Sequence, residues 1–112
     1  MNKAENRKFI RADFSGEVKI RIPQEDKDIS VGAKDISPKG IRVIVGGRFL
    51  KIGTPLEIKI HLQERDILCA GKVVWALTPR PGLGNIIVFD VGIEFTEIGL
   101  EDQEFLGKLF GK

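Results

Sequence analysis

The sequence predicts a mainly all-β fold, a six-stranded antiparallel β-barrel followed by a short C-terminal α-helix. Three observations lead to this prediction. Several segments alternate between apolar and polar side chains and are rich in β-branched residues, as strands are. Thirteen glycines and five prolines are set among them, which favours many short strands. The segments also succeed one another without intervening helices, which is typical of an antiparallel barrel or sandwich.

The first half of the chain is expected to form three strands. Residues 14–22 alternate cleanly and stop at a proline, as a half-buried strand does. Residues 29–36 form a second strand, and an aspartate, a proline and a glycine within residues 35–40 predict a turn. Residues 41–45 are apolar on both faces except at Arg42, as in an inner strand. The inner face of the first strand is predicted to consist of Val18, Ile20 and Ile22.

The second half is expected to form three more strands and the helix. Residues 56–63 alternate most regularly, residues 67–77 follow, and residues 87–95 form a long strand. The prolines and glycines of residues 79–85 exclude a strand interior and predict an exposed loop. One face of the fifth strand is predicted to hold Cys69, Val73, Trp75 and Leu77. The inner face of the sixth is predicted to hold Ile87, Phe89, Val91, Ile93 and Phe95.

The C-terminal segment changes character after Gly99. Acidic residues fill its first turn, where the helix dipole favours them. We expect this helix to close one end of the barrel, with its two phenylalanines as plugs. Its apolar side consists of Leu100, Phe105, Leu106, Leu109 and Phe110. The expected organisation is an arm at residues 1–12, a barrel at 13–98 and a helix at 99–112.

Composition excludes several classes of protein. A chain of 112 residues with 30% charged residues fits one globular domain. Its net charge is +2, yet residues 1–11 alone carry +3, so the rest is close to neutral and unlike a general polyanion binder. No apolar run approaches the roughly 20 residues of a membrane span. We expect no membrane insertion and a cytoplasmic location.

Few residues in this sequence are candidates for enzyme catalysis. His61 is the only histidine, on the polar face of a strand, and Cys69 is the only cysteine, in an apolar strand where a small core residue is expected. One histidine and one cysteine are too few for a metal site built from these residues. No glycine-rich phosphate loop opens a helix. We therefore expect no enzyme activity, no metal and no cofactor.

Two short motifs carry the functional prediction. Arg7 and Arg11 lie four residues apart in the basic arm, and a guanidinium fork fits phosphate oxygens or the O6 and N7 acceptors of guanine. Asp35, Ser37 and Gly40 form an Asp-x-Ser-x-x-Gly motif in the predicted turn. Either motif alone is commonly a solvated arm or an ordinary turn.

Taken together, and in this order, the motifs resemble the PilZ domain. Residues 71–75 (Gly-Lys-Val-Val-Trp) look like the family's Gly-x-Val-x-Trp strand, and residues 92–95 (Gly-Ile-Glu-Phe) like its closing strand. The family comprises bacterial receptors for cyclic di-GMP with a six-stranded antiparallel barrel and a terminal helix. The resemblance covers nearly the whole chain.

The resemblance implies a set of ligand contacts. Arg7 and Arg11 would bind phosphate and guanine acceptors, and ionised Asp35 would accept from guanine N1–H or N2–H. Ser37 would offer a hydroxyl, while Gly40 would allow close approach and a backbone conformation closed to other residues. Further candidates for ligand contact are Lys8, Arg42 and Trp75. For Trp75 two alternatives stay open, a core residue or a ring that supports a guanine.

One position departs from the family pattern. Many members carry an additional arginine where this chain has Asn6, a position linked in the family to binding one ligand or a stacked pair. The stoichiometry is therefore open, while the two arginines that define the motif are present.

The function implied is a non-enzymatic cyclic di-GMP receptor. We expect residues 1–12 to be mobile without ligand and ordered against the barrel by it, which changes a surface offered to a downstream protein. The receptor would be a monomer or a homodimer. One alternative is a PilZ-like protein-interaction domain that does not depend on nucleotide. Another is a barrel that binds RNA or single-stranded DNA, but we expect neither nucleic acid, because that function needs exposed aromatic residues and a broad basic track.

Overall fold

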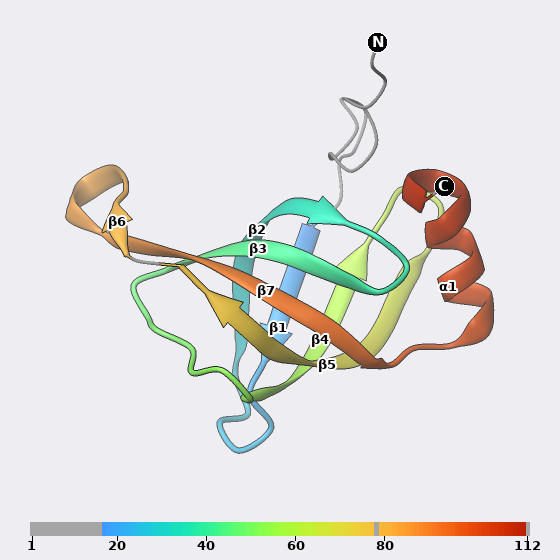
Figure 1. Ribbon diagram of the computed structural model, residues 1–112, viewed down its shortest axis with the longest axis horizontal. Helices are drawn as coiled ribbons and strands as arrows, with labels where there is room; N and C mark the ends of the chain where they lie inside the picture. The colour runs from blue at the N-terminus through green and yellow to red at the C-terminus, as the bar shows by residue number, and fades with distance from the viewer. Residues whose placement is uncertain (1–16, 78, 112) are drawn as a thin grey trace, which may run out of the picture.

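A computed structural model describes residues 17–77 and 79–111 of the chain. The strands pair in one antiparallel sheet of order β3-β2-β1-β4-β5-β7-β6, and an additional β3–β7 pairing closes it into a barrel of six strands, with β6 as an appendage (Figure 1). The predicted six-stranded barrel with a short terminal helix is confirmed. In chain order the strands are β1 (Glu17–Arg21), β2 (Asp28–Ile36), β3 (Gly40–Gly46), β4 (Pro55–His61), β5 (Asp66–Ala76), β6 (Arg80–Pro81) and β7 (Ile87–Glu97). A short turn, η2 (Leu83–Asn85), precedes β7, and α1 (Leu100–Leu106) and a final turn, η3 (Gly107–Gly111), follow it.

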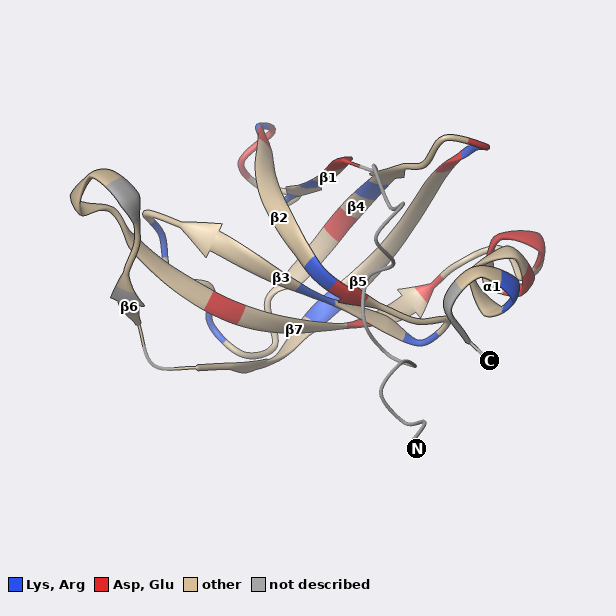
Figure 2. Ribbon diagram, turned by 90° about the horizontal axis from the view of Figure 1, so that it is seen from above, with Lys and Arg blue, Asp and Glu red and all other residues tan. Residues whose placement is uncertain are grey.

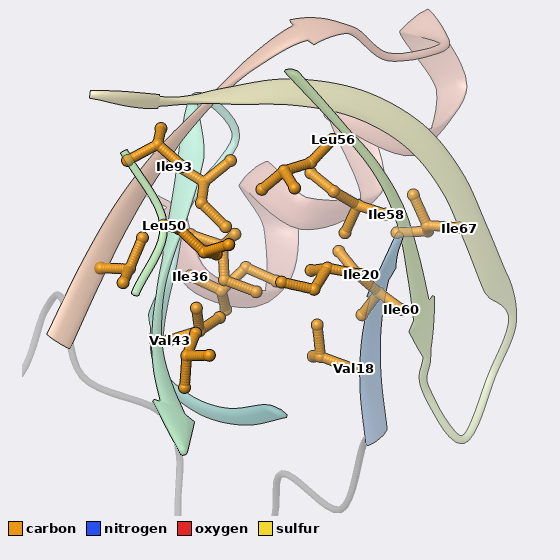
Figure 3. Packing of buried hydrophobic residues seen from close by; sticks show 14 of the residues in the cluster. Val18, Ile20, Ile36, Val43, Leu50, Leu56, Ile58, Ile60, Ile67 and Ile93 are labelled. Atoms are coloured by element: carbon orange, nitrogen blue, oxygen red, sulfur yellow. The ribbon is translucent and has the colours of Figure 1, made fainter. Parts of the chain in front are cut away.

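The barrel interior is filled by aliphatic side chains from every long strand (Figure 3). Alternation puts every second residue inside, so the polar partners of these residues face outward. The predicted inner face of β1 is confirmed, because all three of its apolar residues are buried. The fully buried residues with the largest side chains are Ile20, Ile36, Leu50, Leu56, Ile60, Ile67 and Leu106.

One side of the barrel is regular. β1 pairs with β4, and β4 with the first half of β5, without any shift of register. Outward-facing side chains on these three strands therefore follow the simple two-residue period of the sequence.

The other side contains two outward-turning bulges. These bulges shift the register between Ala33 and Asp35, where β2 meets β3, and between Val73 and Trp75, where β5 meets β7. A further shift lies between Ala70 and Gly71, where β5 meets the end of β7. The prediction that Trp75 and Leu77 share one face with Val73 is wrong, because the extra residue Val74 reverses the alternation and leaves both side chains exposed. Cys69 lies before this bulge and is partly buried against the core.

Helix α1 closes one end of the barrel, as expected, but with a different plug (Figure 1). Leu106 is completely buried, whereas Phe105 is only partly buried, with the Arg65 guanidinium 5.1 Å from its ring centroid. The other predicted plug, Phe110, has a side chain outside the described part. The helix also donates from the Gln103 amide to the Pro38 carbonyl at 3.2 Å, which joins it to the β2–β3 turn.

The glycine- and proline-rich loop lies at the opposite end of the barrel (Figure 1). It contains a two-residue strand, β6, that pairs with the start of β7, so the prediction of a loop without strand is wrong at these two positions. Proline is compatible with such an edge position because it needs no ladder donor. Ile87, predicted to be inside, is 46% exposed at this end of β7. Within the described residues, no helix is long and apolar enough to cross a membrane.

Candidate functional site

A row of side chains crosses the outer surface of four neighbouring strands. Asp35 on β2 lies opposite Arg42 on β3, Arg42 opposite Gly92 on β7, and Gly92 opposite Trp75 on β5. Figure 2 shows charge on β2 and β3 where these strands run side by side. The row brings together residues up to 57 positions apart in the chain, and we call it the bulged face.

The bulge in β2 puts Asp35 on this face. Ile29, Val31 and Ala33 point toward the core, and plain alternation would send Asp35 the same way. The extra residue, Lys34, shifts the register by one, so that Asp35 lies opposite Arg42 and is only half-buried. A carboxylate thereby escapes the cost of burial in an apolar core.

Ser37 holds the turn between β2 and β3. Its backbone N–H donates to the Gly40 carbonyl at 2.9 Å, and its hydroxyl accepts from the Lys39 N–H at 3.2 Å. The hydroxyl also lies 3.5 Å from the Gly40 carbonyl, which is long for a hydrogen bond. The Ser37 hydroxyl therefore donates at most a weak hydrogen bond within the protein, and it can donate to an acceptor on a ligand instead.

Gly40 is required by the barrel itself. A methyl group built there would overlap the Ile93 carbonyl oxygen of β7, so only glycine lets the two strands come this close. The expectation of a special backbone conformation is wrong, because Gly40 is not among the described residues with positive φ. The close approach at Gly40 thus serves strand packing. The Lys39 carbonyl reinforces it by accepting from the Phe95 N–H at 2.9 Å.

Arg42 lies half-buried in the middle of the row. Its Nε is inaccessible to solvent and has no hydrogen-bond partner among the described residues. An inaccessible donor without an acceptor carries a free-energy cost of about 1–3 kcal/mol. A ligand acceptor or a small local adjustment at this position would relieve that cost.

Trp75 is on the outer surface, so the core alternative is excluded. Its side chain is 37% exposed and its indole ring covers the backbone of Gly92. A methyl group on Gly92 would overlap three atoms of that ring, so only a glycine lets the ring pack directly on the β7 backbone. We call this contact the seat of the Trp75 ring. The sequence analysis missed this role of Gly92, although a glycine inside an apolar strand often marks a close approach.

The remaining candidates cannot be placed on this face. Arg7, Lys8 and Arg11 lie outside the described residues, as does Asn6. The described part therefore brings together the Asp35–Gly40 turn, Arg42 and Trp75, with Gly92 between the last two. The contribution of the N-terminal arm stays a prediction.

The other potentially reactive side chains in the barrel, Cys69 and His61, lie in environments that explain them as structural residues. Burial, together with the nearby Asp102 carboxylate, raises the pKa of the Cys69 thiol to about 12, so it is protonated at neutral pH. His61, predicted on the polar face of its strand, has its Nδ1 2.7 Å from the carboxylate of Asp66, its cross-strand neighbour. Among the described residues, no three His, Cys, Asp or Glu side chains gather as metal ligands do.

Comparisons with known proteins agree with this geometry. The family model described as the PilZ domain matches residues 5–111. No relative was found among curated proteins. Three solved structures share the fold: the inhibitor of motility MotI/DgrA of Bacillus subtilis, a complex of MrkH from K. pneumonia with c-di-GMP, and the PilZ domain of YcgR from Escherichia coli with c-di-GMP.

Sequence identity to these structures is low, while structural coverage is high. MotI/DgrA is 20% identical with a TM-score of 0.63, over 97% of this chain and 54% of its own. The MrkH complex is 18% identical with a TM-score of 0.73, over 97% of this chain and 51% of its own. The YcgR domain is 10% identical with a TM-score of 0.68, over 98% of this chain and 89% of its own. The chain thus spans about half the length of the first two.

Proposed function

The chain belongs to the PilZ domain family, and we propose that it is a non-enzymatic receptor for cyclic di-GMP that binds its ligand on the bulged face. The observation that carries this proposal is the outward turn of Asp35 beside Ser37, in a row that continues through Arg42 to the exposed ring of Trp75. Carboxylate, hydroxyl, guanidinium and indole are the groups that a ligand with two guanines and two phosphates needs.

Each side chain has a distinct role in the proposed complex. Asp35 accepts from guanine N1–H or N2–H, and the Ser37 hydroxyl donates to a ligand oxygen. Arg42, whose Nε has no partner among the described residues, donates to a phosphate or to a guanine acceptor. Trp75 supports a base by stacking, a contact worth about 1–3 kcal/mol.

Arg7 and Arg11 complete the proposed site from the N-terminal arm, with Lys8 adding positive charge. Each arginine offers a planar fork of donors that fits a phosphate or the Hoogsteen edge of guanine. Binding would order residues 1–12 against the barrel, and that ordering subtracts from the net affinity. The changed surface would then be recognised by a downstream protein in the cytoplasm.

Calorimetric titration with cyclic di-GMP tests the proposal and gives the stoichiometry that Asn6 leaves open. Charge-assisted hydrogen bonds contribute roughly 1.5–3 kcal/mol, so Arg7→Ala, Arg11→Ala and Asp35→Ala should each weaken binding about tenfold or more. Lys3→Ala is the matched control in the same arm and should bind like the native protein. Unchanged affinity in all three variants would contradict the assignment.

A second candidate is the nucleotide-independent protein-interaction domain. Large apolar side chains are exposed outside the row of the bulged face, as on a protein-binding surface. They include Phe49, Ile52, Leu77, Ile86 and Ile87. Under this alternative, the native protein gives no heat of binding with cyclic di-GMP in the same titration.

A further inference from the structure

A hollow of about 680 Å³ lies on the regular side of the barrel, away from the row of Asp35 and Trp75. The outward faces of β1, β4 and the first half of β5 form its floor, and the segment between β7 and α1 forms one wall. We call this surface the two-lysine face, because Lys19 and Lys59 line it side by side. The bands of charge on β4 are visible in Figure 2.

Lys19 and Lys59 are direct cross-strand partners on β1 and β4. Directly opposed residues have their Cβ atoms about 5 Å apart, and like charges in this arrangement destabilise a sheet. All the remaining directly opposed pairs of charged residues in the described strands join a base with an acid. These pairs are Arg21–Asp28, Arg21–Glu57, Asp35–Arg42, Lys72–Glu94, Glu17–His61 and His61–Asp66.

Neither lysine is neutralised within the described part of the chain. Arg21, the basic residue next along β1, has carboxylates of Asp28 and Glu57 at 3.2 and 3.8 Å. No ion pair or hydrogen bond of Lys19 or Lys59 side chains occurs among the described residues, although both residues are half-buried. An unfavourable local arrangement that a protein retains is a mark of a functional surface.

An apolar side chain continues the same row. Leu68 on β5 lies directly opposite Lys59 and is 66% exposed, while Ala70 and Ile98 also line the hollow. Neighbouring strands are about 4.8 Å apart, so Lys19, Lys59 and Leu68 span roughly 10 Å across the surface. A matching ligand therefore combines carboxylates with an apolar group at short spacing.

We propose that the two-lysine face docks an acidic segment of a partner protein, in which carboxylates lie between Lys19 and Lys59 and an apolar side chain packs on Leu68. A nucleic acid fits less well, because Asp28, Glu57 and Glu97 also line the hollow and would repel a continuous phosphate backbone crossing it, whereas a short acidic segment needs to contact only the two lysines. The proposal goes beyond nucleotide recognition and does not depend on it, since the two faces share no residue of their rows.

The test uses the full chain and a short fluorescein-labelled peptide of alternating glutamate and leucine. Fluorescence anisotropy should show saturable binding that weakens as salt is added. Lys59→Glu should reduce the affinity about tenfold, because it removes one charge-assisted contact and adds a repulsive one. Leu68→Ser should reduce it severalfold through lost apolar contact.

Two controls keep the test decisive. Lys51→Glu makes the same change in net charge at an exposed loop position and should leave peptide binding unchanged. The melting temperature of Lys59→Glu should stay equal or rise, which separates lost docking from lost folding. Equal loss of affinity in Lys51→Glu and Lys59→Glu, or no binding by the native protein, overturns the proposal. An oligothymidine that binds as tightly and is equally sensitive to Lys59→Glu also overturns it, because the face would then bind polyanions in general.

Discussion

The two outer faces of the barrel are built in opposite ways. On the floor of the two-lysine face, β1, β4 and the first half of β5 pair in unbroken register, and the side chains repeat every second residue. On the bulged face two extra residues, Lys34 and Val74, interrupt the ladders of β2 and β5. Each interruption turns the next side chain outward, Asp35 in one strand and Trp75 in the other.

The difference shows how one barrel can carry two unlike surfaces. A regular ladder can present a functional group only by the choice of residue, as with the paired lysines. A bulge also changes which side of the sheet a given position faces, so a polar or aromatic residue can leave an otherwise inward-facing series. The core beneath stays apolar, because no polar or charged residue is buried among the described residues.

Deleting Lys34 should have the largest effect on stability and on ligand binding, since it removes the bulge in β2 and makes the ladder as regular as that of the two-lysine face. Asp35 would then directly follow the inward-facing Ala33 and stay outward opposite Arg42, but β2 would lose the extra bend and twist that the bulge gives it. We expect a lower melting temperature, because the strand is shortened by one residue, and a reduced heat with cyclic di-GMP, because the Asp35 carboxylate leaves the unbent strand in a different direction. Lys34→Ala keeps the residue count and the bulge, so this control should retain both properties. If the deletion variant binds normally, the bulge is not what positions Asp35.

Gly92→Ala should have the next largest effect, again confined to the bulged face. The added methyl group overlaps the Trp75 ring, and forcing extra atoms into a packed contact costs about 1–3 kcal/mol. Because Trp75 is the only tryptophan, displacement of its ring should shift the emission spectrum directly. Gly32→Ala is the matched control, since a methyl group there meets no atom within 4 Å. Identical emission spectra for the two variants would disprove the seat assigned to Gly92.

A pair of charge changes tests the electrostatic difference between the faces. Lys59→Glu replaces a like-charge pair by an opposite-charge pair with Lys19, and should raise the free energy of unfolding by about 0.2–1 kcal/mol. Glu94→Lys does the reverse on the bulged face, where it opposes Lys72, and should lower stability by a similar amount. Urea titration of both variants measures the two effects. Changes of the same sign would mean that cross-strand charge does not distinguish the faces.

The smallest expected effect is on thermal stability and concerns an ion pair that joins the segment after β3 to the β1–β2 turn. Arg48, which follows β3, donates two hydrogen bonds of 2.7 and 2.6 Å to Glu25 in the β1–β2 turn. These bonds lower the pKa of Glu25 in the folded protein. The pair therefore contributes stability above the ordinary carboxyl pKa, and this contribution is lost as the pH falls through the lowered value. Arg48→Gln should melt slightly below the native protein at pH 7 and level with it in strong acid.

Most of the fold could be predicted from the sequence, because it follows from local alternation. The period of residues 56–62 places Leu56, Ile58 and Ile60 inside, and they are buried. The orientation of Trp75 could not be predicted, because a bulge depends on which residues the neighbouring strand offers and not on the strand's own period. The seat at Gly92 has the same origin, since it joins β7 to a ring from β5.

The candidate site was predicted in part. The Asp35–Gly40 turn and Arg42 lie together as the motif suggested, since they are adjacent in one hairpin. The structural reason for a glycine at position 40 differs from the expected one, which was close approach of a ligand. The close neighbour of Gly40 is the backbone of β7, some fifty residues later in the sequence. A glycine marks that something comes close, but the sequence does not tell which distant segment it is.

The small strand β6 has a consequence for behaviour at high concentration. A sheet that ends in an exposed strand offers free backbone donors and acceptors to other copies, which invites fibrous aggregation. Here the terminal strand is two residues long and includes Pro81, which has no N–H to donate. Sheet extension across this edge is therefore limited both by the length of the strand and by its proline. Replacing that proline would add a backbone donor to the edge and remove one of these two protections against self-association.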